Sequence, residues 1–370
     1  MSSARQRPVG YAVVGLGHIA QVAVLPAFRH ARGSRLVALV SGNRDKLAVL
    51  GRKYRVARTY LYDRFDACLA DPEVEAVYIA LPNDLHLDFA VRAAAAGRHV
   101  LCEKPLALDP AEAREMIRAA MRTGVKLMTA YRLHYEPATL AAIQHVKAGR
   151  IGEIRYFNSS FSYQVTDPRN IRLRLVRGGG PLYDIGIYCI NAARYLMQDE
   201  PVEVTGMLSR SGDRRFREVE ETAAAILRFP GGRVASFVVS FGAADVSRCE
   251  LVGTKGRIVL EPAFEYAEAL RLELTANGRT HRRTFRHTDQ FAGEIEAFSQ
   301  AIRSGRVLEP SGREGLADLR IIEAIVASDR TGRSVRLAPF RKARRPSARQ
   351  RRMRPATRPP EPVEAGAPHE

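Results

Sequence analysis

The sequence predicts an α/β protein with two domains, a doubly wound parallel sheet followed by an α+β domain with an open-faced, mostly antiparallel sheet. The chain has 370 residues, more than one core usually supports. Short apolar runs alternate with helical patterns through the first 130 residues, as crossover helices between parallel strands require. After about residue 150, strand-like runs follow one another through short glycine-containing turns, which favours antiparallel pairing.

We expect the first domain at residues 1–130, the second at 131–336 and a basic, disordered tail at 337–370. Asp109 before Pro110 is a typical helix start, and Pro26 would kink the first helix. The strands expected in the first domain are Gly10–Val14, Arg35–Val40, Arg58–Tyr60, Ala76–Ala80, His99–Leu101 and Lys126–Thr129, and its helices are Ile19–Ala31, Arg44–Tyr54, Leu85–Ala96 and Pro110–Arg122.

The second domain should contain eight strands and three helices. The strands are expected at Ile154–Phe161, Glu203–Leu208, Thr222–Phe229, Val234–Phe241, Ser247–Val252, Arg257–Leu260, Ala269–Leu274 and Arg283–Arg286, and the helices at Leu182–Leu196, Gln290–Arg303 and Gly312–Ser328.

Composition excludes several classes of protein. No run of about eighteen apolar residues occurs, so we expect no transmembrane helix. The start of the chain is short, polar and basic and lacks a secretory apolar segment, so we expect a cytoplasmic protein. The four cysteines are scattered and form no C-x-x-C pair, which predicts structural thiols and no metal site.

The formal net charge of +18 is concentrated partly in the tail. Residues 341–370 hold nine basic and three acidic residues, many prolines and few large apolar residues, a composition typical of disorder. Such a tail could contact nucleic acid or an acidic surface. No nucleic-acid-binding motif accompanies the charge, so we expect a solvated extension and no nucleic-acid partner.

A glycine-rich turn near the start of the chain predicts dinucleotide binding. The run Gly15-Leu16-Gly17-His18-Ile19-Ala20 follows an apolar strand and opens a helix, which fits the form G-x-G-x-x-G/A. Such glycines let backbone amides approach a pyrophosphate at the positive end of the helix. The alternative is an ordinary tight turn.

The end of the second strand indicates which dinucleotide binds. An NAD site usually has Asp or Glu there, to bond the ribose 2′-hydroxyl. This chain has Ser41-Gly42-Asn43, followed by Arg44 and Lys46, a set of donors and cations that suits the 2′-phosphate of NADP. The alternatives are a helix N-cap with solvated charges, and an Asp45 that still reaches a ribose.

Two later segments are also expected to line the cofactor-binding site. Leu81, Pro82 and Asn83 follow a strand at the carboxyl edge of the parallel sheet, where ligands bind, and His86 lies early in the next helix. The run Glu103-Lys104-Pro105 ends another strand, where Lys104 would supply a cation near a nicotinamide. Alternatively, His86 is a packing residue and Lys104 a surface residue.

A candidate acid–base pair lies in the second domain. Asp184 and Tyr188 follow the triple glycine 178–180 and are four residues apart, so on a helix they share one face. Taken alone, the aspartate could complement a helix dipole and the tyrosine could be a core residue. Together with Lys104, they indicate proton transfer beside a hydride carrier.

Over residues 9–336 the chain resembles the Gfo/Idh/MocA superfamily, named after glucose–fructose oxidoreductase, inositol dehydrogenase and a rhizopine-catabolism protein. The resemblance is strongest to the glucose–fructose oxidoreductase branch. The motifs that carry it are Val14-Gly15-Leu16-Gly17, Val40-Ser41-Gly42-Asn43, Tyr78-Ile79-Ala80-Leu81-Pro82-Asn83, the run from Gly97 to Pro105, the run from Tyr131 to Pro137, and the run from Gly178 to Tyr188.

The resemblance implies a Rossmann domain, an open-faced sheet domain and an active site between them. It implies that Lys104 lies near the nicotinamide, that Asp184 and Tyr188 form the opposite wall, and that Ser41 and Lys46 contact a 2′-phosphate. Most relatives have histidine at the position of Tyr188, whereas tyrosine marks the sugar-oxidoreductase branch. Further candidate contacts to sugar or cofactor are Arg132, His134 and Arg172.

The chain departs from the branch in two places. A Trp-Arg pair is usual before the triple glycine, but this chain has Ile171-Arg172 and no tryptophan. A long N-terminal arm helps a well-studied branch member retain its cofactor, whereas about eight residues precede the first strand here. Permanently bound NADP and exchangeable NAD(P) therefore both remain open.

We expect an NADP-dependent oxidoreductase of cyclic sugars that oxidises an aldose at C1 to a lactone or reduces a carbonyl sugar. Tyr188 would transfer the proton, Lys104 would polarise the oxygen and Asp184 would orient the ring. The alternatives are an ordinary sugar or polyol dehydrogenase and a nucleotide-binding regulator that uses its basic tail. The open sheet could pair face to face between subunits, as the resemblance implies, so we expect a homodimer or homotetramer. The sugar and the direction of reaction stay open.

Overall fold

The computed structural model describes residues 7–342 and 344–369, which form two compact units. The first comprises the described residues up to Arg132 together with Thr288–Gly315 and Arg352–Ala367. The second comprises Leu133–His287, the described residues from Leu316 to Arg351, and Pro368 with His369. The chain thus returns to the first unit twice. Residues 288–315 and 352–367 belong to it, although the sequence boundaries assigned them to the second domain and the tail.

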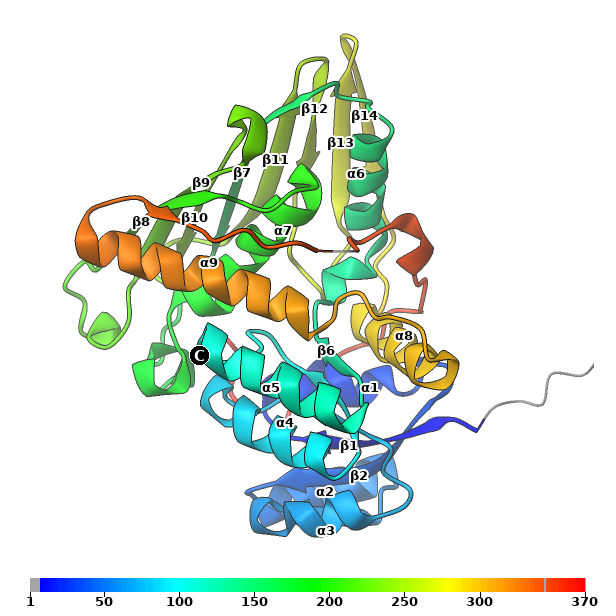
Figure 1. The fold of residues 1–370 in the computed structure, drawn as a ribbon. Helices are drawn as coiled ribbons and strands as arrows, with labels where there is room; N and C mark the ends of the chain where they lie inside the picture. Colours follow the sequence, from blue (N-terminus) through cyan, green and yellow to red (C-terminus); the bar gives the residue numbers. More distant parts are fainter. Residues whose placement is uncertain (1–6, 343, 370) are drawn as a thin grey trace, which may run out of the picture. The chain divides into compact units, whose positions relative to one another are not determined.

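The first unit contains the expected doubly wound parallel sheet (Figure 1). Its order is β3-β2-β1-β4-β5-β6, and every pairing is parallel. Because β1 lies between β2 and β4, the direction of winding reverses there, which is where such sheets bind ligands. The strands are β1 Val9–Val14, β2 Ser34–Ser41, β3 Arg58–Leu61, β4 Ala76–Ile79, β5 His99–Cys102 and β6 Leu127–Thr129.

The helices of the first unit follow their local signals. The Asp109 carboxylate accepts hydrogen bonds from the amides of Ala111 and Glu112 at 2.7 and 2.9 Å, and Gly124 ends the helix with a φ of 70°. The helix after the glycine turn has a π-helical segment, and its α-helical part stops at Ala27, four residues before the expected end. The α-helices are α1 Leu25–Ala27, α2 Arg44–Tyr54, α3 Phe65–Ala70, α4 His86–Ala95, α5 Pro110–Thr123 and α8 Gln290–Ser304.

The second unit contains a mixed, mostly antiparallel sheet in the order β14-β13-β12-β11-β7-β10-β9-β8-β15 (Figure 1). Among its described pairings, only β7 with β10 is parallel. The strands are β7 Ile154–Ser162, β8 Glu203–Ser209, β9 Thr222–Arg228, β10 Val234–Ser240, β11 Val246–Gly253, β12 Gly256–Leu260, β13 Arg271–Ala276, β14 Arg279–Thr284 and β15 Val335–Arg336.

A hairpin turn accounts for the largest shift in a strand boundary. Asn277 and Gly278 both have positive φ angles, 50° and 74°, as a two-residue hairpin turn requires. They let β14 begin at Arg279 directly after β13, whereas the sequence analysis expected the strand at residues 283–286. The Asn-Gly pair was the signal for this turn.

One face of the second sheet is covered and the other is open. Leu227 of β9 and Phe237 of β10 are buried on the covered face, whereas Ile226 and Val238 are 54% and 46% exposed on the open one. The helices of this unit are α6 Pro137–Lys147 and α7 Ile187–Met197, together with the part of α9 Gly312–Thr331 that follows Gly315. None of the helices in the described part of the chain is long and apolar enough to cross a membrane.

A buried arginine joins the helices of the second unit. Arg194 of α7 has no exposed surface, and it bonds Glu200 and the Asp318 carboxylate of α9, each at 2.6 Å. Asn191, one turn earlier, donates from Nδ2 to the other Asp318 oxygen at 2.8 Å, and its Oδ1 accepts from His134 Nε2 at 2.8 Å. Opposite charges thus satisfy one another where burial of a lone charge would be costly.

Candidate cofactor and substrate sites

The glycine turn of the first unit is shaped for close approach to a ligand. Gly15 has a φ of 92°, and a Cβ atom there would lie 2.4 Å from the carbonyl oxygen of Ala80, so only glycine fits. Gly17 is exposed, and a Cβ there would meet no atom within 4 Å. The turn therefore presents open backbone at the start of a helix, which fits a dinucleotide pyrophosphate. His18 and Ile19 are half-buried at this helix start.

The end of β2 carries donors suited to a phosphate. Ser41 is 4% exposed, and its Oγ accepts from the amide of Asn43 at 3.2 Å. Asn43 Oδ1 accepts from the amide of Lys46 at 3.0 Å, so the asparagine caps α2, as one of the alternative interpretations expected. The side-chain NH₂ group of Asn43 is a further donor, which bonds Glu364 Oε2 at 2.8 Å, and Lys46, three residues later, is half-buried.

His86 links two of the expected cofactor segments. Its ring is fully buried, with Nδ1 3.0 Å from the carbonyl oxygen of Pro105 and Nε2 3.0 Å from that of Leu81. Burial lowers the pKa of His86, although both carbonyl oxygens favour the charged form. The imidazole therefore joins the loop after β4, which contains Leu81, Pro82 and Asn83, to the loop of Lys104. It fixes these loops and presents no exposed surface to a ligand.

Lys104 follows a buried cluster of two carboxyl groups. Tyr78 Oη donates toward Glu103 at 2.8 Å and toward Glu294 of α8 at 3.2 Å, and Glu103 also accepts from the amide of Lys104 at 3.2 Å. Lys104 itself is half-buried at the end of β5. Arg132 is 5% exposed and donates to Gln290 Oε1 at 2.5 Å, so it belongs to the same region of the first unit.

The two carboxyl groups differ in environment. Burial raises the pKa of Glu103, and the charges of Lys104 and Arg132 oppose that rise. Burial and the charge of Glu103 together raise the pKa of Glu294 well above its ordinary value, and Glu294 Oε2 is buried without a hydrogen-bond partner. Like charges this close resist joint ionisation. Burial thus favours the protonated form of Glu294, while the charges of Lys104 and Arg132 favour the ionised form of Glu103.

The triple glycine of the second unit brings a loop onto the start of a helix. A Cβ at Gly179 would lie 2.4 Å from the carbonyl oxygen of Arg172, and one at Gly180 would lie 2.6 Å from the carboxylate of Glu220. The amide of Gly180 donates to the same Arg172 oxygen at 2.8 Å. Helical residues follow, first as a π-helical segment Leu182–Gly186 and then as α7, which matches the expected helix at 182–196.

Asp184 is fixed by two donors. Its Oδ2 accepts from Arg172 Nε and from Tyr163 Oη, each at 2.8 Å. Burial and the charge of Asp184 raise the pKa of Tyr163 well above its ordinary value, so this phenol stays protonated as a donor. The structure thus brings together two predicted residues, Asp184 and Arg172, and adds Tyr163, which the sequence analysis missed.

Tyr188 lies against the same end of β7 as Asp184. Its ring makes an edge contact with Phe161 of β7 at 5.8 Å and a tilted contact with Phe264 at 6.2 Å. The ring of Tyr163, which binds Asp184, is 6.3 Å from that of Phe161. Asp184 and Tyr188 therefore point to one region, as the four-residue spacing predicted, and aromatic packing restricts the half-buried Tyr188 ring.

The predicted contact His134 and the neighbour of Arg172, Ile171, have different surroundings in the second unit. His134 has no exposed surface and takes part in the buried network of Asn191 and Asp318. Ile171, at the position where the resemblance implied a tryptophan, is 50% exposed. His134 thus stabilises helix packing, and Ile171 leaves an apolar side chain on the loop beside Arg172.

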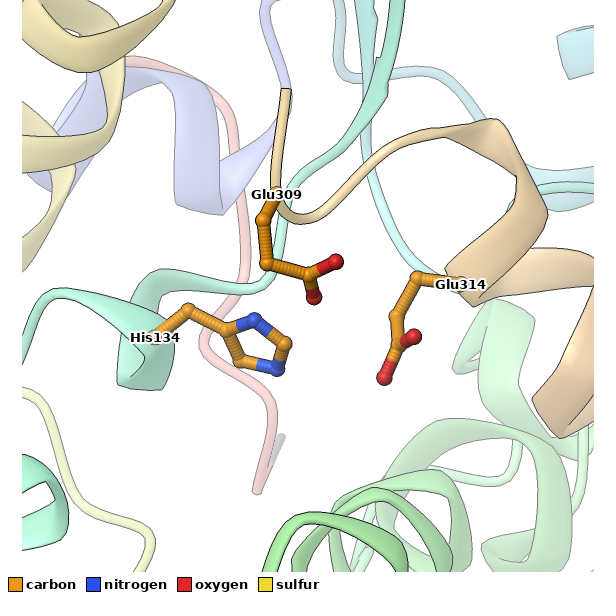
Figure 2. Close-up of side chains that lie close together, drawn as sticks. All are labelled: His134, Glu309 and Glu314. Carbon is orange, nitrogen blue, oxygen red and sulfur yellow. The ribbon is translucent and has the colours of Figure 1, made fainter. Parts of the chain in front are cut away.

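The described carboxylates offer few ligands to a metal ion. Figure 2 shows Glu309 and Glu314 of the first unit, whose carboxylate oxygens come within 4.8 Å of each other; the figure also draws His134, which belongs to the second unit. Two carboxylates are fewer than the ligands a protein site normally supplies. That the protein needs no metal ion stays a prediction.

The parallel sheet, its glycine turn and the second sheet define a protein of the NAD(P)-binding oxidoreductase class. The chain belongs to the GFO/IDH/MocA family: residues 9–131 match the model of the oxidoreductase family's NAD-binding Rossmann fold, and residues 139–259 match that of the GFO/IDH/MocA C-terminal domain. These matches confirm the family and fold class that the sequence predicted.

Three relatives illustrate the range of the family. Aldose–aldose oxidoreductase from Caulobacter crescentus, solved with glycerol, is 38% identical with a TM-score of 0.86, over 90% of this chain and 100% of that one. D-Xylose 1-dehydrogenase [NADP(+)] from Haloarcula marismortui is 32% identical over 90% of this chain and 95% of its own. The 3-ketoreductase KijD10 from Actinomadura kijaniata, solved with NADP and TDP-benzene, is 27% identical with a TM-score of 0.80, over 87% and 98%.

The protonated state of Glu294 predicts a pH-dependent effect on stability. Folding raises the pKa of Glu294. The free energy of unfolding that this group contributes is therefore lost as pH rises from its unfolded pKa, about 4.3, through its folded pKa. Glu294→Gln keeps an oxygen acceptor for Tyr78 and removes this titration. Denaturant unfolding at a series of pH values should show the variant gaining up to about 1.4 kcal/mol on the wild type per pH unit in that window.

Glu75 provides a control of opposite sign. Hydrogen bonds from Arg303 at 2.6 and 2.8 Å lower the pKa of this carboxyl, so its stabilisation is present at neutral pH and is lost as pH falls through the folded pKa. Glu75→Gln should therefore lose stability at neutral pH and approach the wild type in acid. A difference for Glu294→Gln that does not change with pH would show that Glu294 is ionised.

Proposed function

We propose that the chain is an NADP-dependent oxidoreductase of cyclic sugars, which oxidises an aldose at C1 to a lactone or reduces a carbonyl sugar. The observation that carries the proposal is the pair on one helical region of the second unit, Asp184 held by Tyr163 and Arg172, and Tyr188 one turn later. A fixed carboxylate beside a phenol suits a substrate with neighbouring hydroxyl groups. Relatives named for xylose and aldose activities support a sugar substrate.

In the proposed oxidation, Tyr188 takes the proton of the C1 hydroxyl group as the C1–O bond becomes a carbonyl. A phenol is a weak base at neutral pH unless a cation stabilises the phenolate, and Lys104 is the proposed cation. The same ammonium polarises the substrate oxygen. Bound NADP would accept the hydride that leaves C1. Asp184 accepts a hydrogen bond from a neighbouring hydroxyl group and so fixes the orientation of the ring.

The choice of NADP rests on the end of β2. The strand ends at Ser41, the donor Asn43 follows as the N-cap of α2, and no acid occupies the expected ribose position. The exposed Arg44 and the half-buried Lys46 add cations that complement a 2′-phosphate. The xylose dehydrogenase is named for NADP, and KijD10 was solved with it.

Removing the group that transfers the proton should lower kcat and leave the binding of NADP unchanged. We expect Tyr188→Phe to lower kcat about 10²–10⁴-fold, the usual contribution of a positioned proton-transfer group, and Lys104→Met to lower it similarly. Formation of reduced NADP from a panel of aldoses measures this, with the lactone identified. Tyr54→Phe, at the C-terminal end of α2, is the matched control. Unchanged kcat in Tyr188→Phe would exclude the assigned role.

A charge at the end of β2 should reverse the preference between the two dinucleotides. Ser41→Asp places a carboxylate where it repels a 2′-phosphate and can accept from a ribose hydroxyl. We expect the ratio of kcat/KM for NADP to that for NAD to fall about 100-fold or more.

Asp45→Asn tests the remaining alternative: if the exposed Asp45 reaches the ribose, this variant loses activity with NAD selectively.

We further propose that the open face of the second sheet forms a homo-oligomer interface. Apolar side chains gather on it at Met207, Ile226 and Val238, which are 67%, 54% and 46% exposed. Light scattering should give the mass of a dimer or tetramer for the wild type, and a smaller species for Ile226→Arg with the same circular dichroism. A monomeric wild type would contradict the proposal.

A further inference from the structure

The C-terminal segment makes specific contacts with the dinucleotide turn of the first unit. Gln21, in the helix after the glycine turn, donates from Nε2 to the carbonyl oxygens of Leu16 and Val363, each at 2.9 Å. Gln21 Oε1 accepts from the amide of Val363 at 2.7 Å. Gln21 is only 1% exposed, so it joins the backbone of the turn directly to the backbone of the C-terminal segment.

Glu364 occupies a donor that the cofactor would use. Its Oε2 accepts from Asn43 Nδ2 at 2.8 Å, at the end of β2 where the 2′-phosphate of NADP is proposed to bind. Glu364 has a φ of 46°, in the left-handed region that residues other than glycine rarely adopt. Such a conformation persists when the surroundings hold it, and here the bonds of Val363 and Glu364 do so.

The segment is anchored just before it reaches the turn. Arg354 donates through two nitrogens to Glu296 of α8, each at 2.6 Å, and the Glu296 side chain is 4% exposed. Thr357 Oγ1 donates to Asp289 at 3.1 Å, and the amide of Asp289 donates to the carbonyl oxygen of Arg354 at 3.0 Å. These contacts keep residues 358–364 at high local concentration beside the glycine turn.

The last described residues make contacts within the second unit. Thr166 donates through its amide and its hydroxyl to the carbonyl oxygen of His369, at 2.8 and 2.7 Å, and Asn170 donates to that of Pro368 at 3.2 Å. The ring of His369 lies edge-on to that of Tyr163 at 4.9 Å. Tyr163 is the phenol that holds Asp184, so these residues cover part of the proposed substrate cluster.

We propose that residues 359–369 act as an intramolecular competitor of the dinucleotide, with the Glu364 carboxylate standing in for the 2′-phosphate. The inference rests on the proposed NADP site. A carboxylate and a phosphate both accept from amide donors and complement cations, so one set of donors binds either. Binding of NADP then requires release of the segment, and the apparent affinity falls by the fraction of molecules in which the segment is released.

The test compares NADP binding to the full chain and to a chain that ends at Arg358. If the segment is in place in about nine molecules of ten, removing it should tighten the dissociation constant measured by calorimetry about tenfold. Glu364→Gln should give a smaller gain in the same direction. Glu361→Gln, three residues earlier and also exposed, controls for the loss of one negative charge and should leave the constant unchanged.

A second readout follows the segment directly. A protease that cleaves after glutamate should cut the full chain at Glu364 slowly, and faster when NADP is added, as mass spectrometry of the intact chain would show. An equal dissociation constant for both chains, a weaker one after truncation, or protection of Glu364 by NADP would overturn the proposal while leaving the proposed function intact. If neither chain binds NADP, the proposed function fails first and this inference with it.

Discussion

The close approach of the Gly15 turn to the carbonyl of Ala80 is the constraint on which the cofactor side of the first unit depends. β1 pairs with β2 on one side and β4 on the other, so the loops that leave these strands must share one edge of the sheet. Any side chain at residue 15 would overlap the Ala80 carbonyl and push the two loops apart. The absence of a side chain at Gly15 allows this contact. The contact in turn positions Gly17, Leu81 and the donors that follow β2.

Charge on the cofactor side is controlled by burial as much as by pairing. Tyr78 has one hydroxyl proton to offer to the carboxyl groups of Glu103 and Glu294. When Glu294 is protonated, the form that burial favours, the cluster carries at most one negative charge beside the cations Lys104 and Arg132, instead of two. A doubly ionised cluster would hold Lys104 more tightly and weaken its pull on a substrate oxygen. The proposed role of Lys104 therefore depends on a proton held by a residue that follows it by 190 positions.

The sequence predicted the parts of the structure that local chemistry determines. The strand–turn–helix around Gly15, the cap at Asp109 and the alternation in β9 and β10 each arise from neighbouring residues, and the family models confirm the fold. The partners of the site residues could not be predicted, because they are distant in sequence. Tyr78 meets Glu294 after 216 residues, and Tyr163, which directly follows β7, meets Asp184 of the later helical segment Leu182–Gly186. The composition of residues 341–370 likewise did not predict the hydrogen bonds that Arg354 and Val363 make within the first unit.

The proposed selectivity for NADP and the proposed competition by the C-terminal segment draw on the same donors. A site that recognises the 2′-phosphate must offer amide and hydroxyl donors with cations close by, and it must lack the acid that an NAD site uses. Such a site cannot discriminate fully against a carboxylate of its own chain, since both ligands are anions with oxygen acceptors. An acid at residue 41 would repel Glu364 as well as the phosphate. A chain that gained preference for NAD in this way would therefore also release its C-terminal segment, so that cofactor preference and self-competition change together.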